Sequence, residues 1–335
     1  MKKPSAAVSP YPQQSPADNY KLNQFDSTPP VDGETTTTAA TGGRRWSFET
    51  AKASFSKVTT SPLSRASLDV PATQRYRLGS VLGIGTYGTV YLAVDISTGE
   101  GWACKVVSGS ANKAFQMKEI ELLRQIDHPS IVRYREHFTV GDKLHMITEL
   151  VRGKDLGTAI RERGSYAEED ARIVTVQLLE ALHYLSAKGI AHRDIKPANI
   201  MLVSNDEHTR IKIIDFGFGD QLTLTKRHFS RACGTPTHVA PEVIAPEGGK
   251  YNTTCDVWSA GVTLYKLLSG DDAFTADSMS TLVRLVRGGE VWFNDPVWEL
   301  VSPEAQELVQ SMLDSDPTKR VTPCAALSHR WLQGV

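Results

Sequence analysis

The hydrophobic pattern changes its period once along the chain. From Tyr76 onward, short runs of β-branched and aromatic residues (YRLGSVLG, TVYLAVD, GWACKVV) alternate with glycine and turn residues, which predicts an antiparallel β-sheet. The later segment 171–189 (ARIVTVQLLEALHYLSAKG) has apolar residues at helical spacing and ends before Gly189. This order predicts an α+β fold, in which a β-rich lobe with one main helix precedes a mostly α-helical lobe.

Residues 1–72 show neither the pattern of short strands nor apolar residues at helical spacing. They are rich in Ser, Thr, Pro, Ala and Gln and include the unbroken run Thr35–Thr38, so we expect a disordered N-terminal tail that could recruit a partner. Lys2 and Lys3 precede no signal-peptide core, and no glycine follows the initiator methionine. A plastid or mitochondrial transit peptide stays open as an alternative, because the first acidic residue is Asp18.

Composition narrows the class of protein. With 335 residues, 40% of them hydrophobic, the chain can form a two-lobed domain with a sizeable core. A formal net charge of -1 argues against a nucleic-acid partner, and no run of about 18 apolar residues predicts a membrane anchor. Four cysteines lie far apart without metal-ligand spacing, which suits a reducing compartment. We therefore expect a cytoplasmic or nuclear monomer, because the core fold needs no partner chain.

A glycine-rich run, GIGTYGTV, begins at Gly83 between the first two predicted strands. Glycines remove side chains where a backbone must approach nucleotide phosphates. Alone, this run also fits an ordinary hairpin or a dinucleotide fold. Downstream, however, stand HRDIKPANI at 192–200 and DFG at 215–217, with a lysine at Lys105 between these motifs and the glycines. Together they form the protein kinase signature set.

The chain therefore resembles the eukaryotic protein kinases from Tyr76 to Trp331. Further matches are CGTPTHVAPEVI, YNTTCDVWSAGVTLYKLLSG and VWELVSPEAQELVQSMLDSDPTKRVT, which look most like the calcium/calmodulin-dependent and calcium-dependent kinase group. The resemblance implies a bilobal kinase domain over residues 76–333. Its N-lobe would span about 76–148, its hinge 149–154 and its C-lobe about 155–333.

ATP and Mg²⁺ are the ligands that this resemblance implies. Asp194 would orient the substrate hydroxyl and accept its proton, while Lys196 would approach the γ-phosphate. Asn199 and Asp215 would hold Mg²⁺. Lys196, two positions after Asp194, is typical of Ser/Thr kinases, and Phe218 after DFG goes with a preference for Ser over Thr. Protein substrates with Ser or Thr acceptors are the expected partners.

The family also places an ion pair beside the nucleotide. Lys105 would contact the α- and β-phosphates, although Trp102 and Cys104 replace the commoner aliphatic neighbours. Glu119 would fix this lysine, and Glu121 is the alternative that should point to another helix face. The residues expected at the ATP site are Gly83, Ile84, Gly85, Thr86, Tyr87, Gly88, Val90, Ala103, Lys105, Thr148, Glu149, Val151, Asp155 and Met201.

Four further residues are expected to act structurally. By resemblance, Thr235 contacts the catalytic loop, and Asp256 anchors the loop backbone from a buried helix. Glu242 is expected to pair with Arg320.

Two positions bear on which peptide is selected. Asp155 matches an acid that meets ribose or a substrate arginine in related kinases, but it could equally be a helix N-terminal acid. Ala198 stands where arginine-selecting relatives often carry glutamate. An arginine three residues upstream of the acceptor is therefore only one of the substrate features we consider.

A departure from the usual kinase sequence at the expected phosphosite bears on regulation. Arg193 usually goes with a phosphorylated activation loop, yet the usual phosphosite is Arg231 in this chain. We hypothesise that the neighbouring Ser230 is phosphorylated, with a solvated loop serine as the alternative. Ser47, three residues after Arg44 in RRWSF, is a second candidate in the tail.

The chain stops at Val335, directly after the last kinase-like helix, so we expect activity without calcium. A pseudokinase scaffold is the main alternative, but such proteins lose the catalytic lysine, aspartates or asparagine, and none is missing here. A dual-specificity kinase is disfavoured by Lys196 and the GTP segment.

Overall fold

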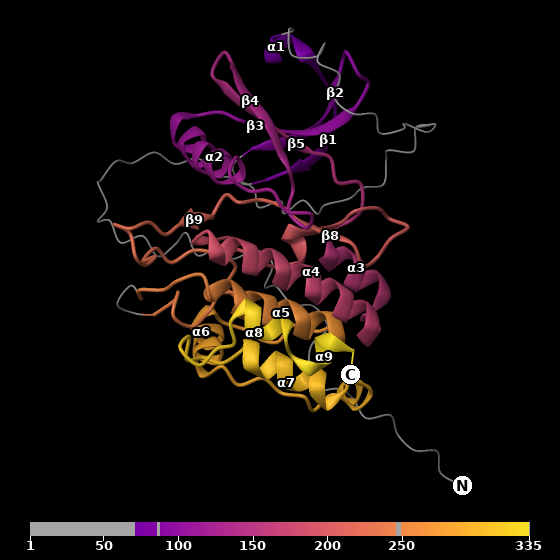
Figure 1. Cartoon of the computed structure of the whole chain (residues 1–335), viewed down its shortest axis with the longest axis vertical. Coiled ribbons are helices and arrows are strands. Elements are labelled where there is room, and N and C mark those ends of the chain that lie inside the picture. The colour runs from indigo at the N-terminus through magenta and orange to yellow at the C-terminus, as the bar shows by residue number, and fades with distance from the viewer. Residues whose placement is uncertain (1–70, 86–87, 246–248, 335) are drawn as a thin grey trace.

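The computed structural model describes residues 71–85, 88–245 and 249–334. Ser47, Thr86, Tyr87 and the predicted tail up to residue 70 lie outside these residues. A sheet-containing lobe lies above a helical lobe, and a single extended crossing connects them after β5 (Figure 1). Ala72, the last residue assigned to the tail, begins the short helix α1 (Ala72–Arg75).

The upper lobe is a five-stranded antiparallel sheet in the order β1-β2-β3-β5-β4, with helix α2 (Ser110–Leu123) beside it (Figure 1). Trp102 and Cys104 lie on one face of β3 and are buried with Ala93 and Ile147, whereas Lys105 lies on the other face. Trp102 and Cys104, the unusual neighbours of Lys105, therefore pack in the core of the upper lobe on the opposite face of β3. The strands are β1 (Tyr76–Ile84), β2 (Thr89–Asp95), β3 (Gly101–Val107), β4 (Tyr134–Val140) and β5 (Lys143–Glu149).

The lower lobe is mostly helical, as the sequence predicts. Its elements are α3 (Leu156–Arg163), α4 (Glu168–Ala187), β6 (Ile190–Ala191), η4 (Pro197–Asn199), β7 (Ile200–Leu202), β8 (Ile211–Ile213), β9 (Asp220–Gln221), α5 (Cys255–Ser269), α6 (Met279–Gly288), η5 (Pro296–Leu300), α7 (Pro303–Met312), α8 (Pro323–Leu327) and α9 (Arg330–Gln333). β6 pairs with β9, and β7 pairs with β8.

The predicted helix over 171–189 is α4, which begins at Glu168. Its first turn contains three acids, Glu168, Glu169 and Asp170, which interact favourably with the positive end of the helix dipole. These acids explain why the helix begins before the predicted start at residue 171. The helix ends at Ala187 because Gly189 adopts a φ of 69°.

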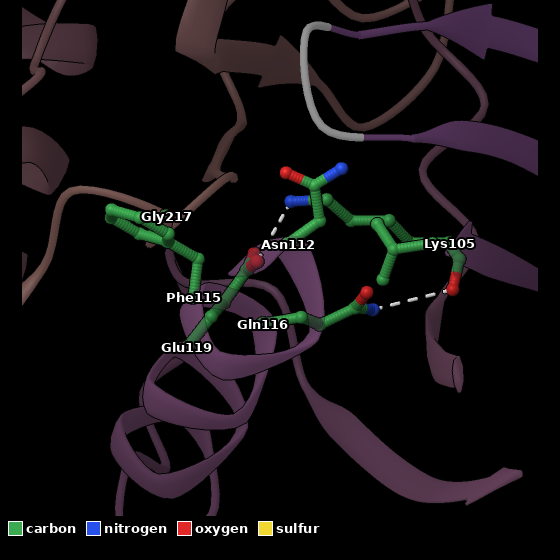
Figure 2. Close-up of a pocket in the computed structure, with 7 residues that line it drawn as sticks. Lys105, Asn112, Phe115, Gln116, Glu119 and Gly217 are labelled. Atoms are coloured by element: carbon green, nitrogen blue, oxygen red, sulfur yellow. Dashed lines mark hydrogen bonds and ion pairs between the residues drawn. The ribbon is translucent and has the colours of Figure 1, made fainter. Parts of the chain in front are cut away.

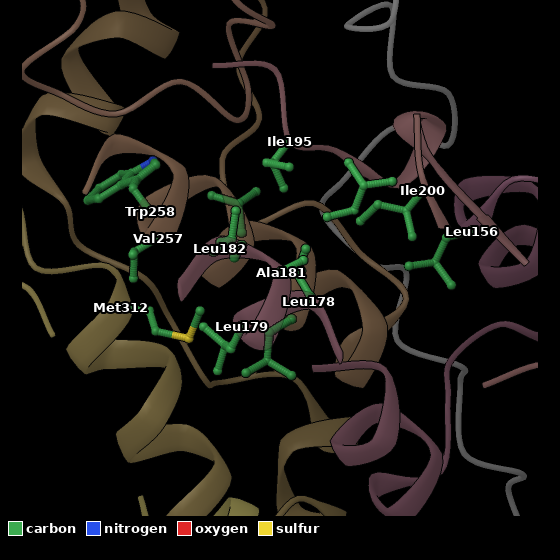
Figure 3. Packing of buried hydrophobic residues seen from close by; sticks show 14 of the residues in the cluster. Leu156, Leu178, Leu179, Ala181, Leu182, Ile195, Ile200, Val257, Trp258 and Met312 are labelled. Carbon is green, nitrogen blue, oxygen red and sulfur yellow. The ribbon is translucent and has the colours of Figure 1, made fainter. Parts of the chain in front are cut away.

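One hydrophobic cluster fills the lower lobe and continues into the upper lobe through Ile120 and Leu123 of α2. Leu178, Leu179 and Leu182 of α4 belong to the same buried cluster as Trp258 of α5 and Met312 of α7 (Figure 3). Helix α5 is buried along nearly its whole length. A helix that is buried on every side is a rigid support for the loops that it contacts. No helix in the described ranges is long and apolar enough to cross a membrane.

Candidate active site

Lys105 is the centre of an ion-pair cluster between the lobes. Its Nζ lies 2.7 Å from Oε2 of Glu119 on α2 (Figure 2). The same Nζ lies 3.2 Å from Oδ1 of Asp215. Glu119 is buried, whereas Glu121 is exposed. The lysine therefore pairs with the glutamate that the family alignment indicates.

Lys105 and Asp215 stabilise each other's charged forms, whereas burial raises the pKa of Glu119. Lys105 holds the pKa of Asp215 at about 2, even though partial desolvation of this half-exposed carboxylate acts in the opposite direction. Burial alone would lower the pKa of Lys105, but Asp215 and Glu119 together raise it. Asp215 has a φ of 62°, which is uncommon for a residue with a side chain. The backbone at DFG is thus held in a special conformation that brings the carboxylate to the lysine.

The catalytic loop forms a second polar cluster around Asp194. Asn199 Nδ2 donates to the Asp194 backbone carbonyl at 2.8 Å and to Oδ2 at 3.0 Å. Lys196 Nζ lies 3.1 Å from Oδ2 of Asp194 and donates to Thr235 Oγ1 at 2.7 Å. The Thr235 hydroxyl donates in turn to Asp194 Oδ1 at 2.7 Å. These contacts orient the carboxylate and join it to the segment that follows DFG.

Helix α5 anchors this loop from below. The buried carboxylate of Asp256 accepts hydrogen bonds from the backbone N–H of His192 at 2.7 Å and of Arg193 at 2.8 Å. Arg193 has a φ of 65°, and an L-residue keeps such a conformation only where its surroundings determine it. The anchor predicted for Asp256 therefore has a direct geometric basis.

Gly88 of the glycine-rich segment lies against β3. Gly85 N–H donates to the Gly88 carbonyl at 2.9 Å. A Cβ atom at Gly88 would lie 2.4 Å from the Val106 carbonyl oxygen, so no side chain fits there. Gly83 and Ile84 are the last residues of β1. This close approach explains the requirement for glycine at Gly88 in the run.

Strand register aligns the other expected ATP-site residues. Val90 on β2 is opposite Gly83 on β1 and Lys105 on β3, while Ala103 on β3 is opposite Thr148 on β5. These residues therefore lie on adjacent strands of one sheet.

The crossing between the lobes supplies the remaining residues. Glu149 Oε2 accepts from Lys212 Nζ at 2.9 Å and from the backbone N–H of Arg133 at 3.2 Å. Val151 packs against the main core, and Met201 on β7 forms an isolated bridge with Asp155. The backbone of the crossing is thus fixed to the lower lobe.

Asp155 is the N-cap of α3. Its Oδ1 accepts from the backbone N–H of Thr158 at 2.8 Å, and its Oδ2 accepts from the Thr158 hydroxyl at 2.6 Å. Of the interpretations kept open for this acid, helix capping is the one with contacts in this structure. Each carboxylate oxygen accepts one hydrogen bond and keeps a lone pair for a further donor, so capping is compatible with ligand binding.

The guanidinium group of Arg193 contacts unmodified residues of the lower lobe. Its Nε donates to the Phe218 carbonyl at 2.7 Å, one terminal nitrogen donates to the Tyr251 hydroxyl at 3.1 Å, and the other lies 3.4 Å from Asp220. Ser230 is exposed nearby. Sequence reasoning missed Asp220 and Tyr251, because neither belongs to a motif that names a partner for Arg193.

The donor atoms suit a magnesium ion that arrives with a nucleotide. No group of three or more His, Cys, Asp and Glu side chains in the described part of the chain could hold a metal by itself. Asp215 offers an ionised carboxylate, and Asn199 uses its amide nitrogen on Asp194, which leaves its amide oxygen as the ligand atom. Mg²⁺ typically binds through one or two such ligands together with substrate phosphates and water.

Comparison with known proteins defines the class. The protein kinase domain model matches residues 76–332, and the chain belongs to this family. Its curated relatives are CAMK-type Ser/Thr kinases. "Calcium/calmodulin-dependent protein kinase type I" of Schizosaccharomyces pombe is 36% identical over 264 residues, which cover 77% of this chain and 78% of that protein.

Two longer relatives show similar identity. "Serine/threonine-protein kinase 33" of Mus musculus is 35% identical over 276 residues, covering 77% of this chain and 55% of that protein. "Calcium-dependent protein kinase 5" of Plasmodium falciparum is 35% identical over 267 residues, covering 79% and 46%. The chain thus matches about half the length of these two relatives.

Proposed function

We propose that the protein is an ATP-dependent serine/threonine kinase that transfers the γ-phosphoryl group of Mg-ATP to Ser hydroxyls, and less readily Thr hydroxyls, of protein substrates. The observation that carries the proposal is the presence of two charged clusters built from the signature motifs. Lys105, Glu119 and Asp215 form one, and Asp194 with Lys196 belongs to the other.

The first cluster would handle the nucleotide. Lys105 would bind the α- and β-phosphates, and Glu119 would keep its ammonium group in place. Mg²⁺, when bound by Asp215 and Asn199, would neutralise charge on the phosphates. Little covalent chemistry is needed beyond this, because phosphoryl transfer proceeds through a loose transition state that is stabilised chiefly by positioning and charge.

The second cluster would handle the acceptor. Asp194 would accept the hydroxyl proton and orient the oxygen for in-line attack. Lys196 would stay close to the transferred group, because its contact with Thr235 fixes the ammonium beside the carboxylate. The same contacts that position the base would therefore position the cation.

Substrate choice is the finer part of the proposal. Phe218 supports a preference for Ser by resemblance. Asp155 caps α3 with one accepted hydrogen bond on each oxygen, which leaves lone pairs for a substrate arginine, whereas Ala198 offers no charge. We therefore include the arginine as a variable of the experiment.

The test is phosphorylation of four matched peptides by purified protein with Mg-ATP. The peptides carry Ser or Thr, each with and without an upstream arginine, and each reaction is run with a calcium-selective chelator and with added calcium and calmodulin. We expect turnover that Asp194→Asn abolishes, with Ser faster than Thr. ATP binding without turnover of any peptide or protein would favour a scaffold function instead.

A further inference from the structure

A cation–π contact joins the segment after DFG to helix α2. The guanidinium carbon of Arg231 lies 5.2 Å from the ring centroid of Phe115. Phe115 stands one helical turn before Glu119, so the two side chains share a face of α2. Both line the pocket that Lys105 and Gly217 also line (Figure 2). The contact between Arg231 and Phe115 therefore lies on the side of α2 that faces Lys105.

The backbone of Arg231 is held by the lower lobe. Its carbonyl accepts a hydrogen bond from the Tyr251 hydroxyl at 2.5 Å, and the same hydroxyl accepts from Arg193. Phe229, two residues before Arg231, exchanges backbone hydrogen bonds with Tyr251 at 2.8 and 3.0 Å. Arg231 thus has its main chain fixed to the lower lobe while its side chain reaches the upper lobe.

Helix α2 lacks the usual local stabilisers at its own N-terminus, although Asn112 Nδ2 donates to the Ser108 carbonyl at 3.1 Å and Gln116 Nε2 donates to the Lys105 carbonyl at 3.3 Å. It begins after Gly109 without a side-chain cap, and its first turn contains no acidic residue. Capping and first-turn acids are the usual local stabilisers of a helix N-terminus. The position of this end of α2 consequently depends more on contacts from outside the helix.

We propose that Arg231 is a positioning residue, whose guanidinium against the Phe115 ring holds α2 where Glu119 meets Lys105. This inference rests on the proposed kinase function. Arg231 supplies a permanent positive charge, so the link between the two lobes forms without any modification of the segment. Losing it shifts α2 toward positions in which Lys105 lacks its carboxylate, and turnover falls with the fraction of correctly placed molecules.

A double-mutant cycle tests this link. We expect Arg231→Ala and Phe115→Leu each to lower kcat by about two- to fivefold, the range of a cation–π contact near a surface. The double variant should lose no more than either single variant, because both remove one interaction. Phe115→Tyr keeps the ring and should keep wild-type turnover.

The matched control is Arg210→Ala, which removes another exposed arginine, paired with Glu207 on the β7–β8 hairpin and remote from α2. It should leave kcat unchanged. Wild-type turnover in Arg231→Ala would overturn the inference. Additive losses in the double variant, or equal losses in Phe115→Leu and Phe115→Tyr, would do the same.

Hydrogen exchange in the nucleotide-free protein gives a readout that does not require activity. Arg231→Ala should speed amide exchange in α2 and leave α4 unchanged. Unchanged exchange in α2 would overturn the positioning role even if the enzyme is active. Faster exchange in α2 of a protein without kinase turnover would support the contact and count against the proposed function alone.

Discussion

Arg320 and Glu242 form a two-pronged ion pair, with the two terminal nitrogens of the arginine 2.6 and 2.8 Å from the two carboxylate oxygens. The Arg320 side chain is fully buried, and it also donates to the Thr254 carbonyl. The pair joins the end of the segment after DFG to the loop that follows α7. It is the pairing that family resemblance predicts for these residues.

Glu242→Gln should lower the free energy of unfolding by roughly 3–5 kcal/mol, because it leaves a buried guanidinium without its counter-charge. Urea denaturation measures the change. Lys319→Ala, one position before Arg320, is the control: Lys319 is 73% exposed, and its removal should change stability by under about 0.5 kcal/mol. Equal stability of Glu242→Gln and wild type would contradict the prediction.

Glu119→Gln should lower kcat by about 10- to 100-fold, because a misplaced Lys105 no longer aligns the phosphates. Glu121→Gln makes the same chemical change two residues away on the exposed side of α2 and should keep kcat within about twofold of wild type. Steady-state kinetics with a saturating peptide would separate the two. A larger effect of Glu121→Gln would mean that the wrong glutamate had been assigned.

Ser230→Ala should retain kcat within about twofold, since Arg193 already has Asp220, Tyr251 and the Phe218 carbonyl as partners. Tyr251→Phe removes only the hydroxyl that bridges Arg193 and the Arg231 carbonyl. It should lower kcat by at least about fivefold, which corresponds to one of the two hydrogen bonds that this hydroxyl makes. Both variants are compared with wild type that is assayed with and without phosphatase treatment. Inactivity of Ser230→Ala would instead support the hypothesis that Ser230 must be phosphorylated.

His238→Gln should change how stability depends on pH. Burial, reinforced by the charges of Lys266 and Lys196, lowers the pKa of His238 to about 3, while Asp194 opposes the shift. Between pH 6.5 and 3 the unfolded chain binds a proton that the folded protein excludes, so His238 destabilises the fold as pH falls through this window.

At pH 5 this effect should cost the wild type about 2 kcal/mol relative to pH 7. His238→Gln should lose that part of the dependence. Urea denaturation at pH 7 and pH 5 measures both proteins. The same slope in both would show that His238 is not the group responsible.

The sequence predicts the parts of this molecule that reside in contiguous motifs. The choice of Glu119 over Glu121 follows from its spacing to the HPSIV turn, and the order of sheet and helices follows from the change of hydrophobic period. Trp102 and Cys104 appear as departures in sequence, yet strand alternation puts them on the face opposite Lys105. Their identity matters to the core of the upper lobe.

Contacts between residues that share no motif could not be predicted. Tyr251 reaches Arg193 across 58 positions in sequence, and Phe115 meets Arg231 only because the backbone after DFG passes α2. Asp155 illustrates a different problem: ribose binding, arginine binding and helix capping all favour an acid there. Only the position of Thr158 distinguishes capping, and that is a matter of local backbone geometry.

Helix α5 couples the chemistry of the site to the integrity of the lower lobe. Asp256, which holds the catalytic loop by two backbone amides, sits on a helix whose neighbours on every side are core residues. Local unfolding of the catalytic loop is therefore costly in free energy, because it disturbs the packing around the buried Trp258. On heating, loss of catalytic competence and melting of this lobe should occur as one cooperative event.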